Sequence, residues 1–267
     1  MTKLKNEKCK KESVFMEERK CVKEILILLG LLILTIVAFP RVTYQLYELF
    51  NMTNVYNSSN LKLSLLMLTW EHIVMSFFGC MFSTILGLAV GIICTIDFGK
   101  EIRVLIEKLM SLSQALPTIG LLAVLVPIFG FGVVPGIIVL VISGIMPIVF
   151  STITGLENVP ASFLEAGRGL GMSGWEVFWR VKVPSAIPVI IAGIRTTSVI
   201  IVGCATLAAI TGAGGLGIPI FSAGIRGFNP VKLLEGTIPV TLLALLVDRT
   251  FVYAEMKAVR KFGCGSY

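Results

Sequence analysis

Charged residues are scarce in this chain of 267 amino acids: Asp, Glu, Lys and Arg together make up only 15%. An ordinary soluble domain has about 25%. Apolar residues make up 55% of the chain and the mean hydropathy is +0.90, so there is too little polar surface to cover a water-soluble globule. These figures exclude a cytosolic enzyme, a disordered protein and a secreted disulfide scaffold, and they indicate an all-α integral membrane protein.

Residues that carry catalysis or bind metals are also nearly missing. The sequence has one histidine, His72, and no Cys-x-x-Cys pair among its six cysteines, so no zinc or haem site is expected. It contains neither a Gly-rich phosphate-binding loop ending in Lys-Ser or Lys-Thr nor a Gly-x-Ser-x-Gly nucleophile turn. We therefore expect no metal, no cofactor and no catalytic residue. Any energy from ATP has to come from another subunit.

Six apolar stretches approach or exceed the length needed to cross a bilayer, about 20 residues. They cover residues 25–39, 72–96, 113–131, 133–153, 186–210 and 234–253. The first is short and could be a signal peptide, but the charged segment before it is long and no small-residue cleavage site follows. We interpret it as a retained helix. The sequence thus predicts a transmembrane domain over 25–257 between a basic cytoplasmic tail at 1–24 and a short cytoplasmic tail at 258–267.

Basic residues are concentrated on one side of these stretches. If the N-terminus lies inside, the cytoplasmic segments hold 18 Lys and Arg and the outer segments hold four. Because positive charge gathers on the cytoplasmic side of membrane proteins, we predict that both termini are cytoplasmic. The same distribution, at the flanks of apolar stretches, indicates contact with membrane lipid and argues against nucleic acid as a partner.

Few residues within the apolar stretches predict a specific contact. Gly87 and Gly91 form a Gly-x-x-x-Gly pattern, which favours close helix packing. Arg195 stands nine residues into the fifth stretch, either near the cytoplasmic interface or as a buried functional charge; the first interpretation is favoured because the residues after it could nearly span alone. Asp248 and Arg249, late in the last stretch, are expected to form an interfacial anchor.

The connection between the fourth and fifth stretches, residues 160–184, is long and has an unusual composition. Its first residues can begin a short helix, and Gly169 and Gly171 can break it because glycine permits a sharp turn. A second amphipathic turn follows, with Trp175, Phe178 and Trp179. A cytoplasmic helix–glycine–helix element with exposed aromatic side chains needs a partner to cover them.

A glycine-rich segment at 211–217 follows the fifth stretch and is too rich in glycine for a stable straight helix. Irregular backbone at membrane depth occurs where it is buried in protein or lines a water-filled cavity. Two copies facing each other would place amides and carbonyls along a central path, whereas the alternative is an ordinary outer loop. The candidate path residues are Gly212, Gly214, Gly215, Gly217, Gln114 and Pro117.

Residues 165–184 resemble the EAA motif of membrane subunits of bacterial ABC importers. The family pattern is Glu-Ala-Ala, three residues, Gly, nine residues, then Ile-x-Leu-Pro. This chain has the same spacing, with Gly167 in place of the third residue and two valines in place of Ile and Leu. The resemblance implies an ATPase-coupling role for Glu165, Ala166, Gly167, Gly171, Phe178, Val181, Val183 and Pro184.

Further segments look like the permease branch that imports glycine betaine, choline, carnitine and related osmoprotectants. They are residues 114–118, 131–136, 144–149, 192–197 and 208–220. The resemblance implies a type I permease of about six helices in the bacterial cell (inner) membrane. It also implies an identical or similar second permease subunit, two cytoplasmic ABC ATPase subunits and a separate extracytoplasmic solute-binding protein.

Two alternatives to an osmoprotectant permease follow from the sequence. Methionine and sulfonate importers share some of the segments named above, so the solute could belong to either of those classes. An ion-coupled secondary carrier is the alternative from another class of transporter. It predicts intramembrane carboxylates and an internal repeat of spans, and neither is evident in the sequence.

Overall fold

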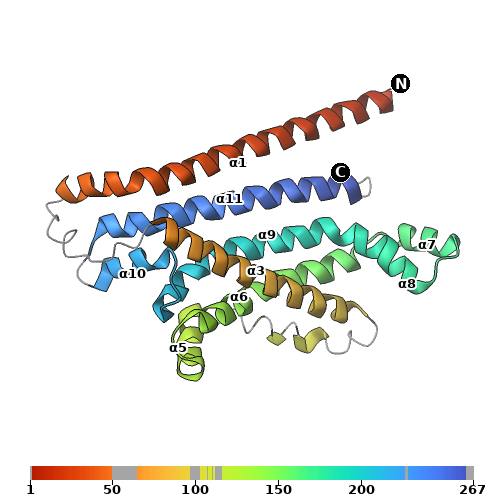
Figure 1. The fold of residues 1–267 in the computed structure, drawn as a ribbon. Helices are drawn as coiled ribbons and strands as arrows, with labels where there is room; N and C mark the ends of the chain where they lie inside the picture. The colour runs from red at the N-terminus through yellow and green to blue at the C-terminus, as the bar shows by residue number, and fades with distance from the viewer. Residues whose placement is uncertain are drawn as a thin grey trace.

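The computed structural model describes residues 2–49, 65–96, 103–106, 108, 109, 111, 116–225 and 228–262. Within these residues all regular structure is helical, which confirms the expected all-α class (Figure 1). The elements are α1 (Thr2–Leu49), α3 (Leu65–Thr95), α5 (Thr118–Phe129), α6 (Val133–Glu157), α7 (Ala161–Gly169), α8 (Gly174–Val177), the π-helical turn η2 (Phe178–Lys182), α9 (Val183–Ala208), the 3₁₀ turn η3 (Ala209–Thr211), α10 (Gly217–Ile225) and α11 (Pro230–Phe262).

Five helical segments of the described chain are long and apolar enough to cross a membrane. They are Met16–Ala38, Leu65–Thr95, Val133–Glu157, Gly174–Ala205 and Pro230–Phe262. The predicted stretch 113–131 differs, because α5 has 12 residues and is about 18 Å long, shorter than the hydrocarbon core of about 30 Å. The glycine-containing turn after Phe129 ends this helix early, so composition alone overstated its length.

Several helices extend beyond the apolar stretches that predicted them. The N-terminal segment expected as a tail is helical from Thr2, and α1 continues through Pro40 to Leu49. Proline removes one backbone donor but does not by itself end a helix. The next helix, α3, begins at Leu65 rather than at residue 72, and α11 continues to Phe262. Hydropathy locates the apolar centre of a helix, whereas polar residues at its ends also take helical conformation.

The helices are arranged with α1 and α11 side by side, and α9 lies against the other side of α11 (Figure 1). The helices α6 and α3 also pack against α9, and they contact each other. The start of α1, the end of α11 and the α7–α8 segment lie at one end of this bundle, and α10 lies at the other (Figure 1). The arrangement therefore separates the loop at 160–184 from the glycine-rich segment at 211–217.

Glycines bring α3, α6 and α9 into unusually close contact. A Cβ atom added at Gly91 would lie 2.6 Å from Cβ of Thr152, and one added at Gly144 would lie 2.7 Å from Cδ1 of Ile201. Gly87 is equally tight against α6, so the close contact expected at the Gly-x-x-x-Gly pattern is confirmed. A side-chain hydroxyl joins the same helices: Oγ1 of Thr197 donates to the carbonyl of Gly144 at 2.8 Å.

Substitution of Gly91 by leucine should destabilise the subunit by about 1–3 kcal/mol, because α6 leaves no room for the side chain. Gly203 in α9 is the matched control, since a Cβ there meets nothing within 4 Å. Gly203→Leu should leave the stability unchanged or raise it by up to about 1 kcal/mol through helix propensity. Thermal unfolding of the two purified variants, followed by tryptophan fluorescence, measures the difference. Equal stability would contradict the glycine-mediated packing.

Candidate functional site

The loop at 160–184 folds into two short helices joined by a left-handed turn. The first helix, α7, follows Pro160, whose extended backbone places it just outside the helix. Gly171 has φ +79°, a conformation that costs other residues about 1–2 kcal/mol. Its N–H donates to the carbonyl of Arg168 at 2.9 Å, and the next N–H, of Met172, donates to the carbonyl of Gly167 at 3.2 Å. The break expected at Gly169 and Gly171 is confirmed at Gly171, whereas Gly169 is the last residue of α7.

The second short helix begins with a reciprocal cap that sequence analysis missed. The N–H of Glu176 donates to Oγ of Ser173 at 3.3 Å, and the N–H of Ser173 donates to the Glu176 carboxylate at 3.0 Å. The signal was present as Ser-x-x-Glu, which is typical of the start of a helix. The cap fixes the direction in which the chain enters α8 after the glycine turn.

The two halves of the EAA-like motif pack against each other. Gly167 is buried, and a Cβ there would lie 3.4 Å from Val177 and 3.5 Å from Val181. Glu165 and Ala166 remain exposed on α7. The later motif residues Val183 and Pro184 form the start of α9 and so continue the second short helix. The structure therefore brings the predicted coupling residues together into one compact element.

An aromatic cluster covers the outside of α8 and η2. The ring centroids of Trp175 and Phe178 are 6.3 Å apart, and those of Phe178 and Trp179 are 5.3 Å apart. Trp175 is 70% exposed and Trp179 is 45% exposed. Clustered aromatic side chains with this exposure form a surface suited to binding another protein.

One continuous helical rod connects this loop to the glycine-rich segment. It comprises α8, η2, α9 and η3, that is residues 174–211, and the residues at each junction have right-handed helical backbone. At about 1.5 Å per residue the rod is about 55 Å long. Sequence analysis expected the two segments as separate features. Their connection by one rod was not predicted, because the motif residues at 178–184 were assigned to a loop.

The glycine-rich segment at 211–217 forms a tight turn between η3 and α10. Gly212, Gly214 and Gly215 have φ of +77°, +90° and +83°. One end of the turn is fixed to the α5–α6 connection, because the Gly132 N–H donates to the Thr211 carbonyl at 2.7 Å and Oγ1 of Thr211 donates to the Gly132 carbonyl at 2.9 Å. The segment is therefore an ordered non-helical turn, as its composition predicted.

The candidate path residues differ in their surroundings. Gly212 is exposed and has nothing within 4 Å of an added Cβ, and Gly214 is partly exposed. Gly215 and Gly217 are buried, the first against α3 and the second against α9. Pro117 is exposed at the start of α5, whereas Gln114 lies outside the described residues.

The other end of the turn is held by Glu71, a residue that sequence analysis did not select. Its Oε2 accepts a hydrogen bond from the Gly215 N–H at 2.9 Å. The neighbouring His72 is fully buried, and its Nε2–H donates to the Val202 carbonyl at 3.0 Å. Glu71 was overlooked because the predicted stretch began one residue after it. Glu71 lies in a helix of spanning length, as does Glu235 in α11. Sequence analysis discussed only Arg195, Asp248 and Arg249 as ionisable residues within the apolar stretches, so it left these two glutamates out.

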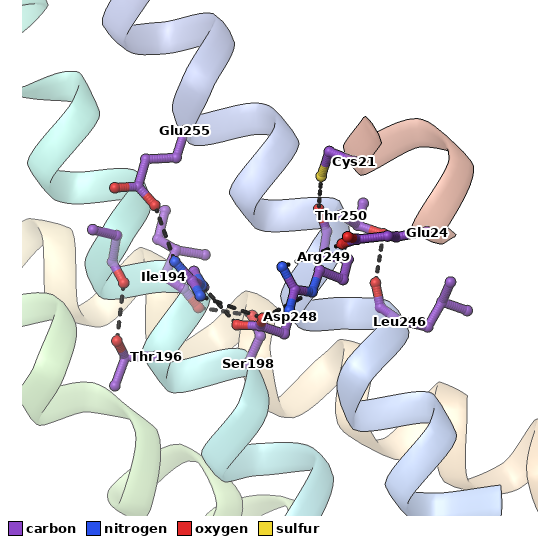
Figure 2. A network of polar contacts seen from close by, with 12 residues as sticks. Cys21, Glu24, Ile194, Thr196, Ser198, Leu246, Asp248, Arg249, Thr250 and Glu255 are labelled. Atoms are coloured by element: carbon purple, nitrogen blue, oxygen red, sulfur yellow. Dashed lines mark hydrogen bonds and ion pairs between the residues drawn. The ribbon is translucent and has the colours of Figure 1, made fainter. Parts of the chain in front are cut away.

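A network of charged side chains joins α9, α11 and α1 (Figure 2). Nε of Arg195 donates to Oδ1 of Asp248 at 2.6 Å, and Nη1 donates to Oε2 of Glu255 at 3.4 Å. Arg249 pairs with Glu24 of α1 at 3.3 Å. Glu24 immediately precedes the apolar stretch 25–39. The network thus lies level with the start of the apolar part of α1, which favours the interfacial interpretation of Arg195.

The sequence matches the family described as binding-protein-dependent transport system inner membrane component over residues 87–258. It is 36% identical, over 74% of this chain and 89% of the relative, to the glycine betaine/carnitine/choline transport system permease protein OpuCB of Bacillus subtilis (strain 168). It is 38% identical to the carnitine transport permease protein OpuCB of Listeria monocytogenes, over 69% of this chain and 84% of that protein. The choline transport system permease protein OpuBB of Bacillus subtilis (strain 168) is 37% identical over 72% of this chain and 88% of its own length.

The fold is similar to those of solved transporter structures. A chain of the inward-facing MetNI methionine ABC transporter superimposes with a TM-score of 0.67 at 21% identity, over 75% of this chain and 99% of that one. A chain of an amino acid ABC transporter crystallised with histidines gives a TM-score of 0.58 at 16% identity, over 74% of this chain and 93% of that one. Together with the family match, these similarities show that the chain belongs to the family of binding-protein-dependent transport system inner membrane components and is a multi-pass permease subunit of an ABC importer.

Proposed function

We propose that this subunit forms, with an identical or similar second permease subunit, the path by which a quaternary ammonium osmoprotectant enters the cell. Glycine betaine, choline and carnitine are the candidate solutes. The observation that carries this proposal is the similarity, at 36–38% identity over most of both chains, to permeases named for these compounds. The solute itself is expected to be captured first by a separate extracytoplasmic binding protein.

The loop at 160–184 is the proposed docking site for the cytoplasmic ATPases. The aromatic cluster of Trp175, Phe178 and Trp179 supports this role, since the exposed rings of its two tryptophans leave apolar surface open. The rod at 174–211 supports coupling, because a displacement of the loop is carried along one helix to the glycine turn. Two ATPase subunits would serve the two permease subunits.

The orientation proposed for the subunit places the loop and both termini in the cytoplasm. The start of α1, the end of α11 and the α7–α8 segment lie at the same end of the bundle (Figure 1), and the sequence has many of its basic residues in these three segments. The glycine turn and α10 then lie toward the outer side, where the binding protein releases solute. Gly212 is the turn residue proposed to border the path, because it is exposed and a Cβ added there would meet nothing within 4 Å.

Uptake measurements test the solute class. Cells that lack other osmoprotectant importers, and that express this chain with its transport partners, should accumulate labelled glycine betaine, choline or carnitine when the permease is present. Methionine and an alkanesulfonate serve as competing solutes. Uptake of either one instead would assign the permease to that class. Uptake into vesicles driven by an ion gradient without ATP would indicate a secondary carrier and contradict the proposal.

Removal of the exposed aromatic surface should weaken ATPase binding. Trp175→Ala is expected to reduce the affinity by about 30-fold or more, because a tryptophan buried at an interface typically contributes at least about 2 kcal/mol. Trp70→Ala is the matched control: Trp70 is 66% exposed, close to the 70% of Trp175, but belongs to α3. Co-purification of the ATPase with each variant measures the effect. Equal retention by both variants would argue against docking on the aromatic cluster.

Asparagine substitutions distinguish a path-lining glycine from a packed one. Gly212 and Gly215 both have left-handed φ, which asparagine tolerates, but only Gly215 is packed against α3. Gly215→Asn should therefore reduce folding and expression. Gly212→Asn should fold and bind the ATPase normally yet reduce uptake at least about tenfold, equivalent to about 1.4 kcal/mol in the transport barrier. Normal uptake by Gly212→Asn would show that the turn does not border the path.

A further inference from the structure

Arg195 lies at the contact between two parts of the bundle that are packed in different ways. On one side α9 is interlocked with α6, where an added Cβ of Gly144 would lie 2.7 Å from Ile201. On the other side α9 meets α11 through Arg195 and through aliphatic side chains such as Val202 and Leu243. Of the glycines that the structure describes, none receives a side chain across the α9–α11 contact. This contact is therefore the smoother of the two and is better suited to small sliding movements.

Two carboxylates of α11 lie within reach of the same guanidinium group. Asp248 holds it in a two-point contact, with Nε–Oδ1 at 2.6 Å and Nη2–Oδ2 at 3.3 Å. Glu255 makes a single longer contact, with Nη1–Oε2 at 3.4 Å. The two carboxylates are seven residues apart, about two helical turns or 10 Å, and both point from α11 toward α9 (Figure 2). Arg195 thus forms a two-point ion pair with Asp248, and Glu255 is a second acceptor that is already in contact.

The position of Arg195 in the rod links this contact to the coupling loop. Arg195 lies near the middle of residues 174–211, so movement of the loop along the helix axis moves the guanidinium group by the same amount. Glu255 is closer than Asp248 to the C-terminal end of α11, the end at which the α7–α8 segment also lies (Figure 1). Displacement of α9 toward the loop therefore carries Arg195 from Asp248 toward Glu255.

We infer that Arg195 is a positioning residue that alternates between Asp248 and Glu255 during transport. It is held in a two-point contact by Asp248 here, and it passes to Glu255 when α9 is displaced toward the end of the bundle that carries the loop. This inference rests on the proposed function, in which the ATPases move that loop. The pair of acceptors keeps the guanidinium neutralised throughout the movement, as its partly buried place requires, and limits the travel of α9.

Distance measurements across the α9–α11 contact test the inference in the complete transport complex, purified through a tag on this chain and placed in lipid vesicles. Spin labels are attached at Val189→Cys and Val259→Cys, two exposed positions on α9 and α11, in a variant without native cysteines. We expect the distance to change when a non-hydrolysable ATP analogue is added. Glu255→Gln should abolish this change and reduce ATP-driven uptake about tenfold, while the ATPase remains bound.

Glu24→Gln is the matched control for a general loss of charge. It removes another ion pair of the same network, with Arg249, and its side chain is 37% exposed against 31% for Glu255. Because Glu24 does not contact Arg195, uptake should stay within about threefold and the distance change should persist. Arg195→Lys supplies a second test that preserves charge: lysine lacks the planar fork that holds two carboxylates, so the nucleotide-dependent change should be lost.

Three results would overturn the inference. The first is an unchanged α9–α11 distance with and without nucleotide in a complex that transports. The second is an equal loss of the change in Glu24→Gln and Glu255→Gln, which would reduce the network to a structural role. The third, which holds even if Glu255→Gln does not insert, is a normal distance change in Arg195→Lys. Purification of the wild-type complex without ATPase subunits would instead contradict the proposed function.

Discussion

The close approach of α3, α6 and α9 is the constraint on which the rest of the structure depends. Without side chains at Gly91 and Gly144, the three helix backbones come near enough for Thr152 and Ile201 to occupy the vacated space. In a bilayer, where lipid tails are as apolar as leucine, such close packing and the hydroxyl bonds beside it supply much of the association energy. The interlocked helices fix the axis of α9, and α9 carries both the coupling loop and the glycine turn.

Ion pairs connect the other face of α9, the one toward α11, to its neighbour. The bilayer makes an unpaired charge costly, so the guanidinium groups of Arg195 and Arg249 each have acidic partners on neighbouring helices. These pairs are specific in partner but tolerant of small shifts, unlike the glycine contacts, where a shift of an ångström produces a clash. The bundle thus combines a rigid block with a helix pair, α1 and α11, held against it by aliphatic contacts and ion pairs.

Sequence alone predicted the features that depend on local residues. Apolar length located the helices, spacing selected the residues that are proposed for ATPase coupling, and the left-handed turn at Gly171 followed from glycine chemistry. The features that sequence analysis missed depend on contacts between residues far apart in the sequence. Glu71 gained its role from Gly215, 144 positions away, and no periodicity reports such a pairing. The length of α5 was overstated because hydropathy does not register where a turn ends a helix. The single rod at 174–211 was divided between a predicted loop and a predicted span.

The glycine turn is held in a way that makes it responsive to the rod. At one end Thr211, the last residue of the rod, is hydrogen-bonded to Gly132, and at the other end Gly215 is hydrogen-bonded to Glu71. Because α9 is interlocked with α3 and α6, a movement of the rod along its axis carries these neighbours with it, and the few bonds keep the turn attached to the moving block. They join the turn to α3 and to the α5–α6 connection, and Gly212 between them is open. The loop at 160–184 is therefore connected to the glycine turn by one helical rod, without a relay of separate rearrangements. Two small sets of hydrogen bonds anchor the turn.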